Sequence, residues 1–291
     1  MNLGDDFKYE GIDIKNLNLP SKWILSKLNR IIKTYDQFMD KYEFMEASKI
    51  LYSFVWDDFA SWYVEISKVD LQSNDLNNIK STKNVLVYVL KAILKMLHPY
   101  TPFITETIYQ ELPHKHESIT VSSWPKINME FDFVKEEENV NDLISVVTSI
   151  RNTRALSNKP ISEALTFNFY SLDSNFLKGT EKYLDKFINP KEMKFLDNDI
   201  KNQKEYHIQV LPKCKIYIPL DELVNKEEAI KKLNSDKAKL EAEIKRSESI
   251  LNNESFLAKA PKAKVDIEKE KYEKYKIQYA ELLKSLNELL N

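Results

Sequence analysis

The stretch LKMLHPYTPFITETIYQEL at residues 94–112 joins two apolar segments through an abrupt break. His98 and Pro99 stop the first segment, because the residue before a proline is pushed away from the helical conformation. Thr101 is placed to cap a second helix, with Pro102 at its first position, where a missing N–H costs nothing. The stretch therefore predicts two consecutive helices joined by a tight connection, as in a helical bundle.

Two long helices are predicted before this break, because apolar residues recur there at steps of three and four. Pro20 and Ser21 open the first helix, with Ser21 as its N-cap, and the second runs from about Glu43 to Lys68. Residues 70–81 are polar and predict a loop before the next helix. The predicted buried stripes are Ile24, Leu28, Ile31, Tyr35, Phe38 and Tyr42, then Phe44, Ala47, Leu51, Phe54 or Val55, Phe59, Trp62 and Ile66, then Val85, Val89, Ile93 and Leu97.

The pattern changes after Trp124 and Pro125. An acidic run at 136–138 precedes a predicted helix that continues to about Leu156, and another helix is predicted near 174–188. Alternating or β-branched segments between and after them predict strands. These segments are LTFNFY at 165–170, YHIQVL at 206–211 and KIYIPL at 215–220. We therefore expect a small α/β domain.

The last part of the chain predicts an antiparallel coiled-coil hairpin, because two heptad runs flank a break at 257–261 that contains a proline. Each arm of about 27 residues would extend roughly 40 Å. Lys237 and Ser247 interrupt the first seam, and they either fix its register or are tolerated defects. The seam residues are Ile230, Leu233, Lys237, Leu240, Ile244, Ser247 and Leu251, then Tyr272, Tyr275, Tyr279, Leu282, Leu286 and Leu289.

The composition argues against several classes of site. Only 3 glycines occur in 291 residues, and no glycine-rich phosphate loop is present. The net charge of −2 means that a nucleic-acid partner would need local basic patches. The single cysteine, Cys214, excludes an internal disulfide framework and fits a reducing cytoplasm. His114 and His116 have no second Cys/His pair, so no metal site is expected.

No membrane association is expected either. The most apolar predicted helix, at 84–97, carries Lys91 and Lys95, and a membrane-spanning helix needs about 20 predominantly apolar residues. The N-terminus has no signal-peptide pattern.

Several motifs resemble the anticodon-binding region of class I aminoacyl-tRNA synthetases, and the valyl-tRNA synthetase family above all. The bundle motifs are shared with the isoleucyl, leucyl and methionyl relatives, whereas the coiled-coil tail with FLAKAP separates the valyl family from them. An isoleucyl enzyme would end in a cysteine-rich zinc module, for which this chain has no cysteines. The matching motifs are WILSKLN at 23–29, WDDFASWYVEISK at 56–68, LHPYTPFITETIYQEL at 97–112, SSWP at 122–125, SIRNTRAL at 149–156 and LNNESFLAKAP at 251–261.

The resemblance implies a mainly α protein in three parts. Residues 1–130 would be an anticodon-binding helical bundle that is truncated at its N-terminus, 131–222 the small α/β domain and 223–291 the coiled-coil arm. The bundle would receive the anticodon stem-loop of tRNA(Val), and the arm would lie against the outer corner of that tRNA. If one bundle helix is missing, a groove between the 21–42 and 84–97 helices should lie open.

The resemblance also implies what this chain lacks. The HIGH-like and KMSKS-like signatures that handle ATP are absent, and so is the editing domain. We therefore expect no catalytic residue and no cofactor in this chain, which should be inactive alone. The full-length enzyme would be cytoplasmic and monomeric, and it would join valine to tRNA using ATP with magnesium.

The candidate tRNA-binding residues are basic side chains with an alternative role in each case. Those of the first helix form either a solvated face or phosphate contacts, and those at 151 and 154 make either salt bridges or RNA contacts. Those of the arm either bind phosphates or only solubilise it, while Phe256 either stacks on exposed bases or closes the hairpin core. The candidates are Lys22, Lys27, Arg30, Lys33, Arg151, Arg154, Lys239, Lys245, Arg246, Phe256, Lys259, Lys262 and Lys264.

Two further questions remain open in the sequence. The aromatic residues Trp56, Phe59, Trp62 and Tyr63 could stack on RNA, but most of them match the buried spacing, so core packing is the preferred interpretation. As a whole, the chain could be the equivalent region of an isoleucyl, leucyl or methionyl enzyme. It could also be a helical adaptor that binds proteins through its hairpin.

Overall fold

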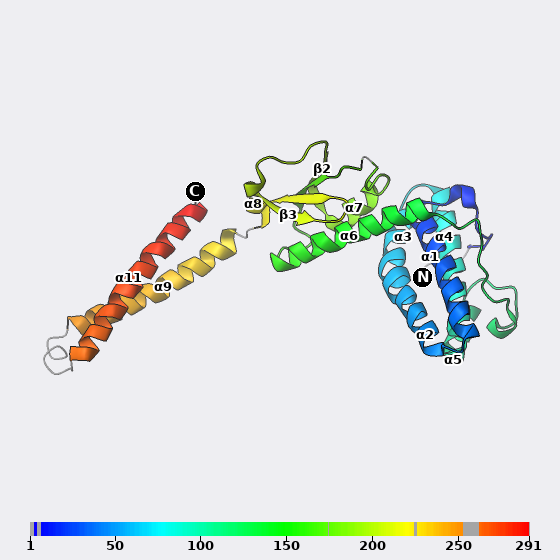
Figure 1. Ribbon diagram of the computed structural model, residues 1–291, viewed down its shortest axis with the longest axis horizontal. Coiled ribbons are helices and arrows are strands. Elements are labelled where there is room, and N and C mark those ends of the chain that lie inside the picture. The colour runs from blue at the N-terminus through cyan, green and yellow to red at the C-terminus, as the bar shows by residue number, and fades with distance from the viewer. Residues whose placement is uncertain (1–2, 5–6, 174, 224–225, 253–261, 291) are drawn as a thin grey trace. The chain divides into compact units, whose positions relative to one another are not determined.

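The computed structural model describes residues 3–4, 7–173, 175–223, 226–252 and 262–290, without the side chains of 226–232, 262–263, 285 and 287–290. The chain divides into two compact units, Met1–Ile218 and Pro219–Asn291. The first unit contains a helical bundle and a small mixed sheet, and the second is a pair of long helices (Figure 1). The predicted fold class, mainly helical with a small α/β part and a C-terminal helical hairpin, is confirmed.

The first long helix begins earlier than predicted. Helix α1 spans Leu19–Asp40, and its N-cap is Asn18, whose side-chain oxygen accepts from the Ser21 amide at 2.9 Å. The prediction of Ser21 as the N-cap was wrong, because Asn18 satisfies the free amides one turn sooner. Ser21 is instead buried, and its hydroxyl lies 3.1 Å from the Tyr63 hydroxyl.

The second long helix is continuous but not uniform. It comprises α2 (Phe44–Ser53), a π-helical segment η2 (Phe54–Tyr63) and α3 (Val64–Leu71). Side chains in a π-helix follow an i→i+5 pattern, so spacing rules for an α-helix fail there. Phe59 and Tyr63 are buried as predicted, but Trp56 is 61% exposed, so its assignment to the core was wrong.

The loop between the second and third helices is shorter than predicted. Helix α4 (Leu76–Leu97) starts inside the expected loop, because the Asp75 carboxylate caps it by accepting from the amides of Asn77 and Asn78 at 3.0 and 3.2 Å. Helix α4 ends at the predicted His98-Pro99 break, and α5 spans Pro102–Gln110. Thr101 occupies the predicted cap position, although its hydroxyl donates to the Leu97 carbonyl.

Among the described residues, the apolar side chains of α1 and α4 are packed in a core, and the expected open groove is not seen there. Trp23, Leu28 and Val89 are at most 1% exposed, and the Tyr35 hydroxyl donates to the Met96 carbonyl at 2.8 Å. The predicted stripe of α1 fails only at its end. Tyr42 lies beyond the last residue of α1 in a left-handed conformation and is 79% exposed.

The sheet has the order β2-β1-β4-β3, with β1 parallel to β2 and antiparallel to β4. Helix α6 (Val134–Leu156) lies beside it, and Ser149 of α6 donates to Gln209 of β3 at 3.4 Å (Figure 1). Strands β1 (Leu165–Tyr170), β3 (Tyr206–Val210) and β4 (Lys215–Pro219) and helix α6 match the predictions. Helix α7 (Glu181–Ile188) is shorter than expected.

Strand β2 (Pro190–Leu196) was not predicted. It opens with a proline and carries three charged side chains, Lys191, Glu192 and Lys194, a composition typical of an edge strand rather than a buried one. Helix α7 is the connection between the parallel strands β1 and β2. Strand β2 is therefore held in the sheet by its parallel pairing with β1, although much of its sequence is polar.

A buried carboxylate connects the bundle to this crossover helix. Asp70 of α3 is 0% exposed and accepts hydrogen bonds from Asn78 of α4 at 3.0 Å, and from Lys182 and Tyr183 of α7 at 2.5 and 3.0 Å. Burial, together with the charge of Asp70, raises the pKa of the Tyr183 hydroxyl. The phenol thus remains a hydrogen-bond donor to the carboxylate.

The second unit contains α8 (Leu220–Leu223), α9 (Lys226–Leu251) and α11 (Lys262–Leu290), and α9 packs against α11. Two hydrogen bonds show the antiparallel direction: Tyr279 donates to Glu241 at 2.7 Å and Ser247 donates to Glu268 at 2.8 Å. Ser247 is 1% exposed, so it pairs inside the seam. Lys237 lies 4.0 Å from Glu241 on its own helix. The predicted turn at 257–261 lies outside the described residues.

We expect the substitution Asp70→Ala to lower the free energy of unfolding by about 2–4 kcal/mol, because it leaves the donors of Asn78 and Tyr183 unpaired in a buried site. Urea denaturation followed by tryptophan fluorescence would measure this change. Asp57→Ala is the matched control, since Asp57 is exposed and accepts from Ser53 on the same continuous helix. Equal effects of the two substitutions would contradict the role assigned to Asp70.

Candidate nucleic-acid interface

Three of the four basic candidates on α1 are held in ion pairs with other elements. Lys22 lies 3.0 Å from Glu136 of α6. Lys27 lies 2.5 Å from Asp58 of η2, and Arg30 pairs with Glu137 of α6. These three cations therefore brace α1 against its neighbours. An RNA phosphate at these positions would compete with a carboxylate.

The pairs differ in how much of the cation remains accessible. The side chains of Lys22 and Lys27 are 29% and 24% exposed, whereas that of Arg30 is 52% exposed. Burial pushes the pKa of Glu136 upward, but the hydrogen bonds from Lys22 and a backbone amide, together with the charges of Lys22 and Lys135, outweigh it, and the pKa lies below its usual value. The charge of Lys22 is thus largely committed to Glu136.

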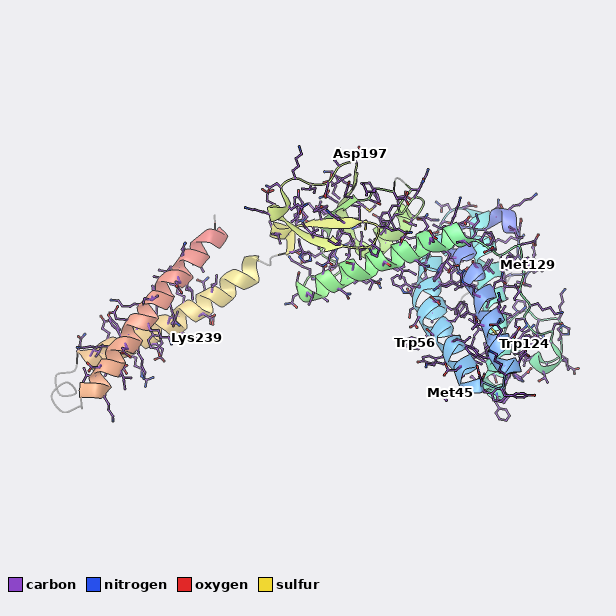
Figure 2. All side chains as sticks on the ribbon, in the orientation of Figure 1. Met45, Trp56, Trp124, Met129, Asp197 and Lys239 are labelled. Atoms are coloured by element: carbon purple, nitrogen blue, oxygen red, sulfur yellow. The ribbon has the colours of Figure 1, made fainter. Side chains whose placement is uncertain are left out.

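Lys33 differs from the other three. It is exposed, and it forms no ion pair with any residue that the structure describes. It lines a small hollow of about 150 Å³ together with Arg30 and Met129, whose side chain is labelled in Figure 2. Of the α1 candidates, Lys33 and the exposed part of Arg30 are therefore the most accessible to a phosphate.

The arginines at 151 and 154 have different surroundings although they are three residues apart on α6. Arg154 is 3% exposed and donates to the carbonyls of Pro160, Glu163 and Ile188 at 3.0, 2.7 and 2.7 Å. Burial lowers its pKa, and the charge of Glu163 partly offsets this shift. This placement favours the intramolecular role that the sequence left open. The acceptors are backbone carbonyls and not the carboxylate of a salt bridge.

Arg151 is exposed, and its guanidinium lies against two aromatic rings that also contact each other, with centroids 6.0 Å apart. Its central carbon is 5.5 Å from the ring of Trp62 and 5.4 Å from that of Phe187, distances at which a cation is attracted to an aromatic face. Trp62 belongs to η2 and Phe187 to α7, so Arg151 links the bundle to the crossover helix. Because the residue is exposed, the RNA contact that the sequence left open is also compatible with this placement.

The candidates on the helical hairpin are exposed. Lys239 and Arg246 have side chains that are 74% and 71% exposed, and each pairs only with an acidic residue three positions away on its own helix. Such surface pairs contribute about 0–1 kcal/mol, so they leave the cation available. Lys245 and Lys264 are exposed and form no ion pair among the described side chains. Figure 2 shows Lys239 projecting outward from α9.

The rest of the predicted arm surface cannot be placed in the same way. Phe256 and Lys259 lie outside the described residues, and Lys262 begins α11 without a described side chain. The alternatives for these three residues therefore stay predictions.

An exposed aromatic pair on α2 and η2 was missed by the sequence analysis. Tyr52 and Trp56 are 65% and 61% exposed, and their rings are parallel within 4°, with centroids 6.3 Å apart. Lys49, Tyr52 and Trp56 follow the exposed Met45 at spacings of four, seven and eleven residues, which defines an outer stripe. Met45 and Trp56 are labelled in Figure 2. This second stripe, opposite the buried one, was the available signal. Exposed aromatic rings are the groups on which unpaired bases stack.

The region around the His98-Pro99 break has a structural role. The two ring nitrogens of His98 lie 2.8 Å from the Thr105 hydroxyl and 3.3 Å from the Thr120 hydroxyl, so His98 ties α4 to α5 and to the segment that follows. In the described part of the chain, no cluster of His, Cys, Asp and Glu is suited to a metal ion. None of the described helices is long and apolar enough to cross a membrane.

Comparison with known families matches both units. Residues 21–167, from α1 to the first residues of β1, match the anticodon-binding domain of tRNA ligases. The chain belongs to this family. Residues 225–290 match the tRNA-binding arm of valyl-tRNA synthetases, and this arm corresponds to α9 and α11. The anticodon-binding domain and the arm thus follow one another along the chain.

Curated relatives of this anticodon-binding chain carry the name valine–tRNA ligase. One from Oceanobacillus iheyensis is 38% identical over 98% of this chain and 33% of its own length. Another from Staphylococcus saprophyticus is 35% identical over 99% of the chain and 33% of its own length. A third from Staphylococcus haemolyticus is 37% identical over 96% of the chain and 32% of its own length. The chain spans about a third of these relatives and matches their C-terminal portion.

We expect Arg154→Lys to lower the free energy of unfolding by about 2 kcal/mol, because one ammonium cannot reach all the carbonyls that the guanidinium holds. Arg151→Lys is the matched control and should change it by less than about 1 kcal/mol, since its cation–π contacts are at the surface. Thermal and urea unfolding would measure both. A larger loss for Arg151→Lys would mean that the cation–π link is the stronger constraint.

Proposed function

We propose that this chain is the tRNA-recognition part of a valine–tRNA ligase, with tRNA(Val) as its partner. The bundle would bind the anticodon stem-loop, and the hairpin would bind the outer corner of the tRNA. The observation that carries the proposal is the pair of family matches in one chain, the anticodon-binding domain at 21–167 and the valyl tRNA-binding arm at 225–290. In this proposal the chain has the three predicted parts: the anticodon-binding bundle at 1–130, the small α/β domain at 131–222 and the tRNA-binding arm at 223–291.

The charge distribution is consistent with this role. The chain as a whole has a formal charge of −2, so attraction to RNA must come from local groups. In the arm, exposed cations such as Lys245 and Lys264 have no carboxylate partner among the described side chains. In the bundle, Lys33 and Arg151 are the accessible cations, and the Tyr52–Trp56 pair offers a surface for unpaired bases.

The proposed reaction of the whole enzyme lies outside the chemistry of these residues. Valine would react with ATP, held with magnesium, to give an adenylate, and the valyl group would pass to the 3′ end of the tRNA. The chain would contribute affinity and orientation to this reaction, as part of a monomeric enzyme in the cytoplasm. Each tRNA contact made here would position the distant 3′ end for transfer.

Binding of valine tRNA to the chain should weaken steeply between about 50 and 200 mM salt, because each phosphate contact releases counterions. The double substitution Lys245→Gln/Lys264→Gln should reduce the slope of log Kd against log salt by up to about 2, roughly one for each lost contact. Filter binding or fluorescence anisotropy would measure the slope.

The double substitution Lys201→Gln/Lys204→Gln is the charge-matched control for this experiment, since both lysines are exposed and belong to the first unit, before β3. It should leave the slope unchanged. A salt-independent Kd for the unsubstituted chain would contradict tRNA binding. Equal affinity for valine, isoleucine and leucine tRNAs would contradict the assignment to the valyl enzyme.

The chain alone should not catalyse ATP–pyrophosphate exchange in the presence of valine, because it contains neither of the two ATP-handling signatures nor a glycine-rich phosphate loop. The standard exchange assay with labelled pyrophosphate would test this, with a complete valine–tRNA ligase as the positive control. Measurable exchange by the chain alone would overturn the division of labour proposed here.

A further inference from the structure

A polar pocket lies between the N-terminal segment and the beginning of α4. Its volume is about 190 Å³, and its walls include Asn16 on one side and Asn77, Ser81 and Asn84 on the other. The three α4 residues recur at steps of four and three, so they share one face of the helix. Typical pockets for whole small molecules have volumes of about 300–1,000 Å³, so this one suits a single planar ring.

Ser81 gives the clearest sign that the pocket is built for a ligand. The residue is only 8% exposed, and its hydroxyl has no hydrogen-bond partner within the described part of the chain. Buried hydroxyl groups nearly always have a partner, because removing one from water without compensation is unfavourable. A ligand group in the pocket would supply that partner.

The neighbouring amides are oriented so that they can complete such a site. Asn84 is 6% exposed, and its side-chain oxygen accepts from the Glu10 amide at 3.2 Å, which turns its NH₂ group toward other acceptors. Asn16 donates its NH₂ group to Asp13 at 2.7 Å, which leaves its oxygen as an acceptor. Asn77 is exposed at the edge. The pocket thus combines donors and acceptors, the pattern needed to read the edge of a base.

The rim of the pocket carries charges of both signs, because Glu10 and Asp13 line it together with Lys80. Lys80 has a side chain that is 54% exposed and is paired with Glu10 at 2.6 Å. It also lines an adjoining hollow of about 260 Å³ that contains Phe7 and Lys83. Leu76, 79% exposed, lies in the same hollow and offers an apolar surface to a neighbouring base. Cations and apolar groups around a polar pocket are typical of sites for single-stranded RNA.

We propose that this pocket receives one unstacked base of the tRNA anticodon loop, with Asn77, Ser81 and Asn84 bonding to the edge of that base. The inference rests on the proposed tRNA-binding function. It adds a site at which the protein would recognise a particular tRNA base, whereas the basic candidates could bind phosphates of any RNA sequence. The reading residues come from the start of α4, inside the matched anticodon-binding region.

The test uses the full 291-residue chain and a hairpin RNA with the valine anticodon stem and loop. Asn77→Ala and Ser81→Ala should each weaken binding about five- to tenfold, since each removes one or two hydrogen bonds to a base. The slope of log Kd against log salt should not change, because phosphate contacts remain. Ser145→Ala, on the exposed side of α6, is the control and should bind as the original chain does.

A second measurement separates base reading from a structural effect. Hairpins that lack the base at the anticodon position held by the pocket should bind the original chain at least as weakly as Asn77→Ala binds the intact hairpin, because the missing base also loses its bonds to Ser81 and Asn84. At that position, combining the missing base with Asn77→Ala should cause no further loss. Additive losses at every position, or unchanged binding by both pocket variants, would overturn the inference while tRNA binding stands. If the original chain ignores the hairpin and whole valine tRNA at low salt, the proposed function itself fails.

Discussion

The carboxylate of Asp70 is completely removed from solvent, and the larger unit is organised around it. A buried carboxylate is stable only when donors surround it, and here these are Asn78 of α4 and Lys182 and Tyr183 of α7. The bundle and the crossover helix of the sheet must therefore fold in a fixed relation. Arg151 reinforces the same junction from outside, where it contacts a ring of η2 and a ring of α7 that pack against each other. The hydrogen bonds to Asp70 thus join the helical bundle and the small sheet domain into one compact unit.

The same constraint explains the mixed character of the sheet. Helix α7 is the crossover that allows β1 and β2 to run parallel, and its first turn carries Lys182 and Tyr183. Anchoring that turn to the bundle fixes where β2 begins, and the left-handed Asn189 ends α7 immediately before it. The polar strand β2 thus owes its position to contacts made elsewhere, not to a buried face of its own.

The sequence predicted those elements whose periodicity is local and missed those decided by tertiary contacts. The break at His98-Pro99, the strands β1, β3 and β4 and the hairpin follow from spacing and proline chemistry. The start of α4 and the N-cap of α1 were misplaced because Asp75 and Asn18 cap better than the residues chosen. The basic residues of α1 could be found by eye, but their acidic partners on α6 lie more than 100 residues away and no spacing rule connects them. Likewise, the orphaned hydroxyl of Ser81 is visible only once burial is known.

The π-helical segment has a consequence for how this region can change in evolution. A π-segment relates to a regular α-helix as a one-residue insertion, since each bond spans one more residue. Removing one residue between Phe54 and Tyr63 would therefore allow the stretch to return to a regular α-helix, with the helices on either side close to their present orientation. Asp70 lies beyond the segment and Tyr52 before it, so the first could stay buried and the second exposed. The change would fall on the side chains inside the segment, and the stretch could lose a residue without disturbing the buried carboxylate.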